Sequence, residues 1–353
     1  ITRSCRAVAC PSSGAASVQR QCVTRLNALA FGLLLALGAV QPAAANVVAD
    51  KSAPGSQQPT IINSANGTTQ VNIQSPSQGG VSRNVYSQFD VDNKGVILNN
   101  SRNNTPTQIG GMVAANPWLT KGEAKIILNE VNSRDPSRLN GYVEVAGKKA
   151  QVVIANPSGI TCDGCGFINA NRATLTTGQA QMNNGNLTGY DVSRGEIVIQ
   201  GKGMDTSRQD YTDIIARSVK VNAGLWANDL KVTAEASTVN AAHEKVVAKT
   251  GDTDTRPQLA VDVASLGGMY AGKIRLTGTE AGVGVRNAGN IGAQAGTVVV
   301  TADGRIESSG NLNSAGDMTL AAGSVSNSGK IYSGGSADVT SRDDIDHSGT
   351  LAT

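Results

Sequence analysis

The last seventy or so residues repeat a short pattern, and this periodicity constrains the fold more than any other feature of the chain. A glycine followed two positions later by isoleucine or leucine recurs at spacings of 21, 19 and 20 residues. Short segments with alternating apolar residues lie between these landmarks and are separated by Gly, Asn or Asp. The landmarks are Gly289–Ile291, Gly310–Leu312, Gly329–Ile331 and Gly349–Leu351, and the alternating apolar residues are Val298, Val300, Met318, Leu320 and Val339.

Repeats of this length predict a solenoid in which equivalent apolar side chains stack from one turn of the chain to the next. A leucine-rich repeat has a similar period, but its L-x-x-L-x-L ladder is absent from the sequence. Glycine occurs 41 times in 353 residues and aromatic residues make up only 3%, which suits short strands joined by tight turns. We therefore predict an all-β protein whose body is a right-handed parallel β-helix.

Earlier segments follow the same pattern less regularly and extend the predicted β-helix toward the N-terminus. Strand-like runs occupy residues 79–101 and 139–160, and the pattern continues to about residue 234. Residues 122–131 fit either a short helix or a buried strand, because periodicity cannot separate the two at this length. The apolar residues of the first run that are expected to point to one side are Val85, Phe89 and Val91.

Two stretches interrupt the pattern. Residues 46–80 are polar with few apolar anchors. We expect them to form an N-terminal β cap, because the end of a β-helix exposes unpaired strand edges that must be covered. Residues 240–257 form the most charged stretch and lack strand alternation, which predicts an insertion that projects from the side of the β-helix.

The first 45 residues have the three parts of a secretory signal. They contain four arginines and no acidic residue, then an apolar run from Leu26 to Val40, and then the small-residue stretch QPAAAN. The apolar run is shorter than the roughly 20 residues of a membrane-spanning helix, although a retained anchor is the alternative. We predict a signal peptide over residues 1–45 with cleavage between Ala45 and Asn46. Because the chain lacks an initiator Met, we expect its true start upstream.

Removal of this leader changes the charge balance. The whole chain has 30 Lys+Arg against 27 Asp+Glu, whereas without the four leader arginines 26 basic residues face 27 acidic ones, a net charge of −1. The basic isoelectric point of the whole chain therefore belongs to the leader. The remaining chain has no basic block with interleaved aromatic residues, so we expect no nucleic-acid partner.

Only two cysteines, Cys162 and Cys165, remain once the leader is removed. A structural zinc site needs four ligands and this pair supplies two, while His243 and His347 lie far away in sequence. A thioredoxin-like site requires a helix after the first cysteine, and GCGFIN is a poor helix start. In an oxidising compartment the simplest interpretation is a disulfide within one turn, with reduced thiols and a metal or catalytic pair as the alternatives.

The sequence lacks the motifs of common catalytic sites: it has no G-x-S-x-G elbow, H-E-x-x-H or P-loop. Its densest acidic cluster, RDDIDH at Arg342–His347, is interpreted as a solvated turn between two turns of the solenoid, with a cation site as the alternative. Enzymes built on β-helices gather several Asp residues and a basic residue on one face, and no such cluster is visible here. We therefore predict no enzyme activity, no cofactor and no metal.

Several phrases, taken together and in order, resemble a known family. They are NVYSQFDVDNKGVILNNS, ILNEVNSRDPSRLNGYVEV, VVIANPSGITCDGCGFINANRATLTTG and MYAGKIRLTGTEAGVGVRNAGNI. The chain resembles the amino-terminal secretion domain of two-partner secretion exoproteins, which include filamentous haemagglutinins, haemolysins and the toxins of contact-dependent growth inhibition. The resemblance covers about residues 58–292. It implies a secretion domain over 46–292 and the start of haemagglutinin-type β-helix repeats over 293–353. The C-x-x-C resembles the growth-inhibition branch in particular.

The two hallmark motifs of this family read N-P-N-L and N-P-N-G-I. The matching stretches here are Asn116-Pro117-Trp118-Leu119 and Asn156-Pro157-Ser158-Gly159-Ile160, so Trp118 and Ser158 replace the second Asn of each motif. The resemblance implies that these are turns important for export. An Asn side chain binds the backbone that follows it, Pro fixes φ, and glycine permits a positive φ, so the turns are retained. Trp118 either packs over the cap or is an exposed partner contact.

The resemblance also implies a route and a partner. The chain would enter the periplasm by the general secretory pathway and be recognised there by the soluble POTRA domains of an Omp85-type outer-membrane barrel. It would then thread through the barrel to the outer surface of a Gram-negative cell, where the repeats fold one on another. A Cys162–Cys165 disulfide adds little width to a threading chain and would brace the turn after the second motif.

Two other functions remain open. The domain itself could be adhesive, binding a glycan or the surface of a host or neighbouring cell, or, less favoured, it could be a carbohydrate-active β-helix enzyme. We expect a monomer. The chain stops within a repeat, so we also expect it to be part of a longer protein, whose nature as adhesin, haemolysin or toxin the sequence does not reveal.

Overall fold

The computed structural model describes residues 46–249 and 256–353. The predicted signal peptide over residues 1–45, including Ala45, lies outside the described residues; Asn46, on the other side of the predicted cleavage site, is exposed. Regular structure in the described part is almost entirely β-strand, with a single turn of 3-10 helix, η1 (Gly55–Gln57). No helix in this part of the chain is long and apolar enough to cross a membrane.

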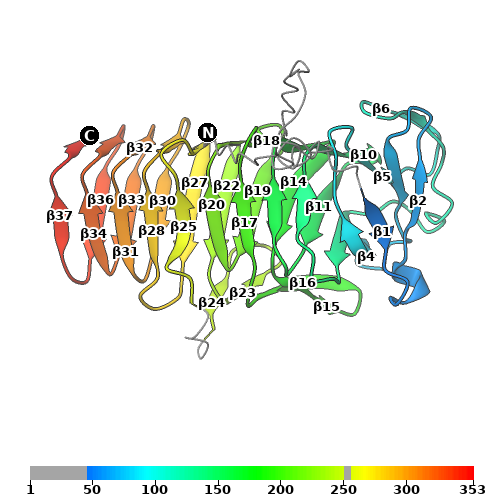
Figure 1. Ribbon diagram of the computed structural model, residues 1–353, viewed down its shortest axis with the longest axis horizontal. Helices are drawn as coiled ribbons and strands as arrows, with labels where there is room; N and C mark the ends of the chain where they lie inside the picture. The colour runs from blue at the N-terminus through cyan, green and yellow to red at the C-terminus, as the bar shows by residue number, and fades with distance from the viewer. Residues whose placement is uncertain (1–45, 250–255) are drawn as a thin grey trace, which may run out of the picture. The chain divides into compact units, whose positions relative to one another are not determined.

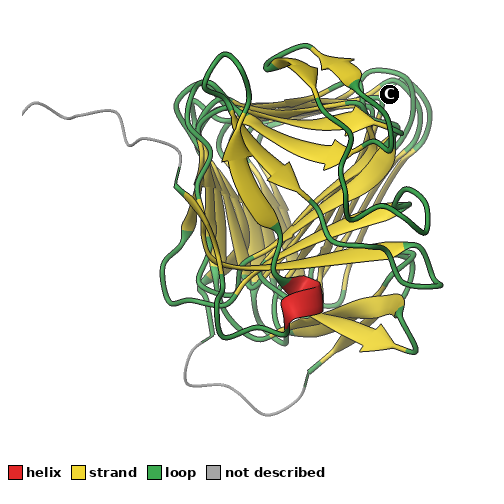
Figure 2. Ribbon diagram, turned by 90° about the vertical axis from the view of Figure 1, so that its right-hand side faces the viewer, coloured by secondary structure: helices red, strands yellow, loops and turns green. Residues whose placement is uncertain are grey.

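Three long sheets form the body of the described part, and in each sheet the strands of successive rungs lie side by side along its length (Figure 1). Each full turn of chain, or rung, passes from sheet A through sheet C to sheet B, and then begins the next rung in sheet A. Equivalent strands of successive rungs pair in parallel; the exceptions within these three sheets are β1 with β4 and β2 with β3, which are antiparallel. This arrangement confirms the predicted β-helix, whose three sheets enclose the core in Figure 2.

Sheet A has 11 strands, which are, in spatial order, β1 (Val47–Ala49), β4 (Val81–Phe89), β8 (Ile126–Val131), β11 (Ala150–Ala155), β14 (Ala170–Thr176), β19 (Tyr211–Ala216), β22 (Asp229–Ala234), β27 (Lys273–Gly278), β30 (Val298–Thr301), β33 (Met318–Ala322) and β36 (Ala337–Ser341). Sheet C has nine strands, β9 (Ser137–Leu139), β12 (Ile160–Cys162), β17 (Glu196–Ile199), β20 (Ser218–Val221), β25 (Leu259–Val263), β28 (Gly284–Asn287), β31 (Arg305–Ser308), β34 (Ser324–Asn327) and β37 (Ile345–His347).

Sheet B has 12 strands, which are β2 (Thr60–Asn63), β3 (Thr69–Asn72), β5 (Val96–Asn100), β10 (Tyr142–Gly147), β13 (Cys165–Ile168), β18 (Met204–Thr206), β21 (Gly224–Ala227), β26 (Gly268–Ala271), β29 (Asn290–Ala293), β32 (Asn311–Ser314), β35 (Lys330–Ser333) and β38 (Thr350–Ala352). Two smaller sheets lie outside the body: the insertion sheet of β15 (Gln179–Asn183), β16 (Asn186–Val192), β23 (Ser237–Asn240) and β24 (Val246–Ala248), and the hairpin of β6 (Thr105–Thr107) and β7 (Gly111–Val113).

The main core runs along the axis of the β-helix and is built from columns of stacked aliphatic side chains. One column on sheet A passes through eight rungs in register: Ile154, Leu175, Ile214, Val232, Leu276, Val300, Leu320 and Val339. Alternation along each strand puts every second side chain into this core. Each rung therefore covers the apolar surface of the one before it, and burial of that surface is the main stabilising term.

The glycine landmark of the repeats occupies the corner between sheets C and B, where the backbones of successive rungs lie close together. A Cβ atom at Gly310 would lie 2.0 Å from the carbonyl oxygen of Gly289, and the same distance separates a Cβ at Gly329 from the oxygen of Gly310. No side chain can be accommodated at that distance. Close backbone stacking, rather than a turn conformation, accounts for this repeated glycine.

Elements outside the regular rungs occur at residues 46–80 and within residues 240–249, as predicted, but the excursion that carries β15 and β16 was not predicted. The cap contains the antiparallel strands β1, β2 and β3. The insertion sheet is assembled from two excursions, one after β14 and one after β22, which leave the same corner and pair through β16 and β23. The insertion sheet packs on the outer face of sheet A. A second apolar core lies between the two sheets and includes Leu128, Tyr190, Ile215 and Val239.

The first strands settle one open choice, between helix and strand, and correct one expected core residue. Residues 126–131 form strand β8, so the ambiguous segment is a strand and not a helix. Phe89 at the end of β4 and Val91 just after it belong to the main core, but Val85 does not. Tyr86 takes its place, with its ring 4.9 Å from that of Phe89. The register of β4 against β1 shifts at this point, and such an irregularity reverses the side on which the side chains lie.

Candidate functional site

The first motif forms the corner that leads into β8, and its asparagine is buried there with only 4% of its surface exposed. The Asn116 side-chain amide donates to the carbonyl oxygens of Ile73 (2.9 Å) and Asn99 (2.8 Å). Its side-chain oxygen accepts the backbone N–H of Trp118 at 3.0 Å, and its own N–H donates to the carbonyl of Ser101. Asn116 thus closes its own turn and ties two other segments of backbone to it.

The other residues of the first motif divide between the core and the surface. Leu119 is buried in the main core, whereas Pro117 is exposed. Trp118 has 45% of its surface exposed, and its indole N–H donates to the hydroxyl of Thr60 in β2 at 3.0 Å. The residue that replaces the second asparagine therefore both faces solvent and joins the motif to the cap.

The second motif forms the corner between β11 in sheet A and β12 in sheet C. Asn156 is fully buried. Its side-chain amide donates to the carbonyl of Asp135 and to the hydroxyl of Ser137, both at 3.0 Å, and its side-chain oxygen accepts the N–H of Ser158 at 2.9 Å. Its backbone N–H donates to the carbonyl of Thr176 in the next rung. All of its strong hydrogen-bonding groups are occupied within the fold.

The remaining residues of the second motif complete the turn. The hydroxyl of Ser158 donates to the carbonyl of Ser133 at 3.0 Å. Gly159 has a φ of +115°, and a Cβ there would lie 3.0 Å from the carbonyl oxygen of Glu196, so both backbone conformation and space favour glycine. Ile160 begins β12 and is buried in the main core.

The two motifs share one hydrogen-bonding geometry but lie apart. In each, the asparagine oxygen accepts the N–H two residues later, and the asparagine nitrogen bridges two acceptors on other segments. The first motif precedes β8 and the second follows β11, which is the parallel neighbour of β8. A six-residue strand measures roughly 20 Å, so the two motifs lie near opposite ends of the strands of sheet A. The structure does not combine them into one site.

Cys162 and Cys165 are joined by a disulfide at the corner between β12 and β13, with Cα atoms 5.4 Å apart. Both sulfur-bearing residues are buried in the main core, so the link faces inward and does not sit on a surface turn. Gly164, between them, has a φ of +81° and donates its N–H to the carbonyl of Gly203 in the next rung. The disulfide begins two residues after the second motif and fixes the following corner.

We expect the loss of this disulfide to lower the free energy of unfolding by about 2 kcal/mol, the value for a loop of four residues in the chain-entropy model. Urea unfolding with and without a reducing agent measures the difference. A variant with both cysteines replaced by alanine should unfold at one urea concentration regardless of the reducing agent. An oxidised chain that is no more stable than the reduced one would contradict this expectation.

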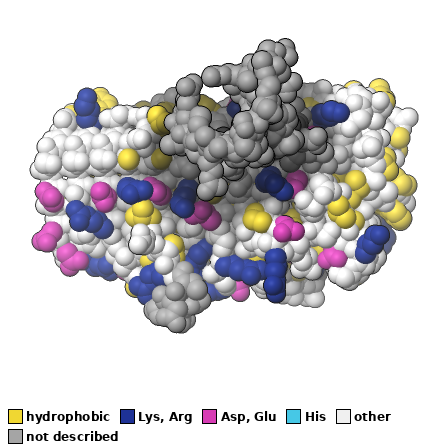
Figure 3. Space-filling model, in the orientation of Figure 1, with side chains coloured by type: hydrophobic (Ala, Val, Ile, Leu, Met, Phe, Trp, Pro, Cys, Tyr) yellow, Lys and Arg dark blue, Asp and Glu magenta, His cyan; other side chains and the backbone are white. Residues whose placement is uncertain are grey.

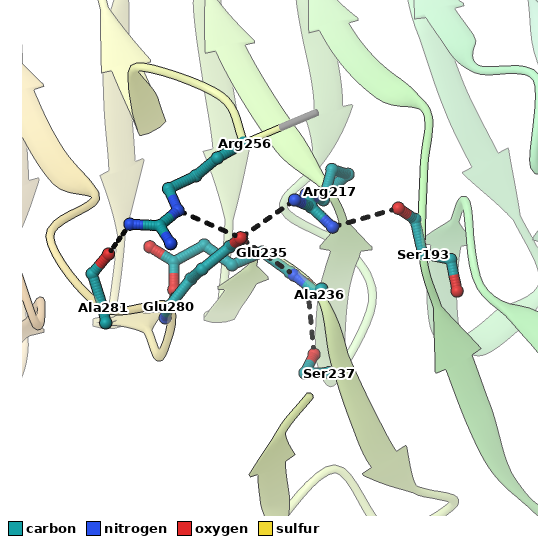
Figure 4. A network of polar contacts seen from close by, with 8 residues as sticks. All are labelled: Ser193, Arg217, Glu235, Ala236, Ser237, Arg256, Glu280 and Ala281. Atoms are coloured by element: carbon teal, nitrogen blue, oxygen red, sulfur yellow. Dashed lines mark hydrogen bonds and ion pairs between the residues drawn. The ribbon is translucent and has the colours of Figure 1, made fainter. Parts of the chain in front are cut away.

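A buried ionic network lies in later rungs at the corner between sheets A and C, the corner that the second motif occupies in its own rung (Figure 4). Arg217 donates to Glu280 at 2.9 Å and to the carbonyl of Ser193 at 3.1 Å. The backbone N–H of Glu280 donates to Glu235, whose carboxylate is fully buried and whose second oxygen has no partner among the described residues. Glu235 also has a φ of +94°, a conformation that costs a non-glycine residue free energy. Arg256 lies 3.7 Å from Glu280 at the edge of the network.

Burial raises the pKa of Glu235 to about 8, and the nearby Glu280 contributes to the increase. In the unfolded chain this carboxyl titrates near its ordinary value of 4.5. Between about pH 4.5 and 8 the folded protein therefore holds a proton that the unfolded chain has released. Because the native state binds more protons, the free energy of unfolding falls as the pH rises through this range.

Glu235→Gln should remove that loss, because the amide carries no charge at any pH. We expect the variant and the parent to have similar midpoints of thermal unfolding near pH 4.5, and the variant to become progressively more stable up to pH 8. Thermal unfolding across this pH series tests the expectation. Glu307→Gln, which changes an exposed side chain on β31, is the matched control and should follow the parent.

A second buried cluster holds the insertion sheet against sheet A. His243 has a φ of +57° and places its Nδ1 atom 2.8 Å from a carboxylate oxygen of Asp213, which also accepts a bond from Arg172 at 2.6 Å. Burial alone would raise the pKa of Asp213, but the hydrogen bonds from His243 and Arg172 lower it below the usual range. The ring of Tyr190 packs edge-on against His243. This cluster stabilises the packing of the insertion sheet on β19, and none of its side chains is hydrogen-bonded to a residue of either motif.

These clusters could hardly be predicted from the sequence. Asp213 and His243 are 30 residues apart, and no periodic pattern relates them. Asp213 stands before an apolar run, which is a weak local signal, whereas His243 lies in the charged stretch 240–257 and does not stand out there. The acidic cluster RDDIDH is exposed in the structure, and within residues 46–249 and 256–353 no group of three or more His, Cys, Asp or Glu side chains is placed to hold a metal ion.

Charged side chains of both signs are interspersed on the face shown in Figure 3. Among the described residues, ion pairs join neighbouring strands, such as Arg286 with Asp262 and Arg83 with Glu130. At the end of the molecule formed by the cap, apolar side chains reach the surface: Val48, Ile62, Met112 and Trp118 are exposed. This capped end combines the outermost strands of sheets A and B with the exposed part of the first motif.

Comparison with known proteins assigns the family. A model of the TPS secretion domain, the domain of two-partner secretion, matches residues 45–308. The chain is 65% identical over 337 residues to "Toxin CdiA" of Yersinia pestis, covering 95% of this chain and 10% of that protein. It is 45% identical over 294 residues to "tRNA nuclease CdiA-2" of Burkholderia pseudomallei, covering 82% of this chain and 9% of that protein.

Among solved structures, the crystal structure of the filamentous hemagglutinin secretion domain matches with a TM-score of 0.68 and 30% identity, over 87% of this chain and all of that one. The chain spans about a tenth of the length of the curated relatives cited. Proteins with this domain engage an outer-membrane transporter and are secreted to the cell surface of Gram-negative bacteria. The chain therefore belongs to the TPS secretion domain family, in exoproteins of the CdiA and filamentous haemagglutinin type.

Proposed function

We propose that periplasmic POTRA domains of the outer-membrane transporter recognise this chain while it is extended, through segments that contain the two asparagine motifs. When the chain folds outside the cell, these segments become buried and can no longer bind the transporter. The observation that carries the proposal is the burial of both asparagines: every strong polar group of Asn156 is used inside the fold, and Asn116 is nearly as enclosed. Neither side chain is free to contact a partner once the β-helix has formed.

Under this proposal, folding outside the cell also keeps the exported chain from moving back. Each rung that forms outside buries the apolar side chains of the preceding rung, which opposes the return of folded chain through a narrow pore. The Cys162–Cys165 link encloses only two intervening residues, so it is compatible with the passage of an extended chain. Passage from the cytoplasm to the periplasm by the general secretory pathway, with a signal peptide over residues 1–45, is part of the proposal.

The experiment compares the POTRA domains' affinity for native chain and for short motif peptides, which cannot fold. Peptides covering residues 110–125 and 150–166 should bind, and their Asn116→Ala and Asn156→Ala forms should bind at least about tenfold more weakly. The folded chain over residues 46–353 should also bind more weakly than the peptides. Tight binding of the folded chain, together with equal affinity for the asparagine and alanine peptides, would overturn the proposal.

The activity of the whole exoprotein is a separate proposal. The relatives carry the names of a toxin and a tRNA nuclease, and this chain matches about a tenth of each. We infer that the toxic activity of the longer protein lies outside the matched tenth, and that this domain serves export. Purified residues 46–353 should therefore leave tRNA intact; degradation of tRNA by this domain would contradict the inference.

A further inference from the structure

A line of flat aromatic rings follows the outer face of sheet B. Register between successive strands places one column of outward-facing residues across eight rungs, here called the aromatic column: Tyr142, Gly166, Asp205, Trp226, Tyr270, Gly292, Asn313 and Tyr332. Their chain neighbours, such as Leu225, Met269 and Ile331, are buried in the main core. Strand alternation therefore points the column toward solvent.

The rings lie along the sheet rather than projecting from it, because glycines make room for them. A Cβ at Gly224 would lie 2.3 Å from the Trp226 ring, and a Cβ at Gly268 would lie 2.6 Å from the Tyr270 hydroxyl. The two strands share the sequence pattern G-[LM]-[WY]-A, and their rings stack with centroids 6.2 Å apart and planes 20° apart. Tyr142 likewise lies over Gly166, at 2.5 Å from the Cβ position.

Within the described residues the rings of Tyr142, Trp226 and Tyr332 are exposed, and that of Tyr270 is half-buried. Trp226 has 42% and Tyr332 has 52% of its surface exposed. Large aromatic side chains at a folded surface are most useful where they contact a partner, and the glycines beneath them show that the local sequence keeps their faces accessible. A contribution to the core does not account for their position.

Over the central rungs, the outward-facing positions of sheet B around the rings carry no charged side chain. The neighbouring outward-facing column contains Gly224, Gly268, Asn290 and Asn311, and the Asn311 side-chain amide donates to that of Asn290 at 2.7 Å. Charged residues flank these rungs: Asp205 lies in the aromatic column at one end and Lys330 beside Tyr332 at the other. The face thus offers aromatic planes and amide groups between its two charged ends.

Gly292 leaves a gap one rung wide in the aromatic column. A depression of about 390 Å³ lies there, bounded by Tyr270, Asn290, Gln294 and Asn313. A second depression, of about 590 Å³, borders Tyr142 farther along the same column, but it is charged, because Lys149, Asp205 and Arg208 also line it. With rungs about 4.8 Å apart, the column from Tyr142 to Tyr332 extends over roughly 34 Å. An elongated ligand can therefore contact several rings and the uncharged depression at Gly292 at once.

We propose that the aromatic column binds a neutral, extended, β-linked polysaccharide chain at the cell surface, lying along the axis of the β-helix. The C–H face of a pyranose ring packs on an aromatic ring, whose face carries partial negative charge, while its hydroxyls bond to amide groups such as Asn290 and Asn313. An extended chain presents successive sugar rings along a straight line, as the column does. The absence of charge on the central rungs favours a neutral chain over an anionic one.

A protein partner fits the same face less well. A peptide that adds to a β-sheet needs a free strand edge, whereas the strands that carry Trp226 and Tyr270 are paired on both sides. This binding site also differs from the segments proposed to meet the transporter, and it exists only in the folded chain. The two proposals can therefore fail independently.

Titration calorimetry of folded residues 46–353 with chitohexaose and cellohexaose tests the proposal, with a heparin hexasaccharide as the anionic comparison. We expect the neutral, β-linked probes to bind and the anionic probe to bind weakly or not at all. Trp226→Ala and Tyr270→Ala should each weaken binding about tenfold. Tyr211→Ala removes a similarly exposed tyrosine from sheet A and should leave the affinity unchanged.

A second readout requires no change in the column. The chain has two tryptophans, so in a Trp118→Phe background the emission of Trp226 alone should shift when a neutral probe binds. The proposal is overturned if neither neutral probe binds the folded parent chain, or if the column variants bind as the parent does. It is also overturned if those variants lose affinity for the POTRA domains while no glycan binds, which would assign this face to the transporter.

Discussion

Asn156→Ala should lower the free energy of unfolding by about 3 kcal/mol or more. The substitution removes a fully buried amide and leaves the carbonyl of Asp135, the hydroxyl of Ser137 and the N–H of Ser158 without their partner. A buried polar group without a hydrogen bond costs about 1–3 kcal/mol, and this site has several such groups within one turn. Urea unfolding monitored by circular dichroism measures the loss.

Ser158→Ala is the matched control in the same turn, because it removes one hydrogen bond from a half-buried side chain. Its cost should be about 1 kcal/mol. Asn116→Ala should resemble Asn156→Ala, since the two asparagines share one geometry. Equal stability of Asn156→Ala and the parent chain would show that the motif acts in export without supporting the fold.

The second large effect is expected at the glycine landmark of the repeats. In Gly310→Ala, the new Cβ would lie 2.0 Å from the carbonyl oxygen of Gly289 and 2.7 Å from the carbonyl carbon of Ala288. Both atoms belong to the backbone, so the neighbouring rungs must separate to relieve the clash. We expect a loss of about 3 kcal/mol, at the upper end of what overpacking costs.

Gly292→Ala provides a control one rung away. A Cβ there meets only the Tyr270 ring, at 3.9 Å, which is an ordinary contact. This variant should keep the parent's unfolding midpoint in urea, whereas Gly310→Ala should shift it to lower urea. If the two variants unfolded alike, close stacking of the backbone would not explain the repeated glycine.

The repeats made the fold predictable, because each unit carries its own apolar alternation and the units stack in order. Residues such as Val300 and Leu320 lie in the core column that their spacing predicts. The turns at Asn116 and Asn156 also follow from local chemistry, since the bond from the asparagine oxygen to the N–H two residues later depends only on neighbouring residues. Structural features that depend on residues within one or two rungs could therefore be predicted from the sequence.

Features that depend on distant residues were not. The exchange of Tyr86 for Val85 in the core results from a shift in register against β1, which no local pattern reports. The inward direction of the disulfide depends on where β12 ends relative to the core. The aromatic column requires residues from strands about 20 to 40 residues apart to align across sheet B, although the repeated G-[LM]-[WY]-A pattern was visible in the chain.

The most direct test of the central conclusion is the amount of this chain, leader included, that reaches the medium with and without the cognate outer-membrane barrel. We expect release only when the barrel is present, and little release of Asn116→Ala or Asn156→Ala under the same conditions. Exposed control variants such as Tyr211→Ala should be released like the parent. Equal release in the absence of the barrel, or retention of the parent chain in its presence, would contradict the assignment of this chain as a transporter-dependent secretion domain.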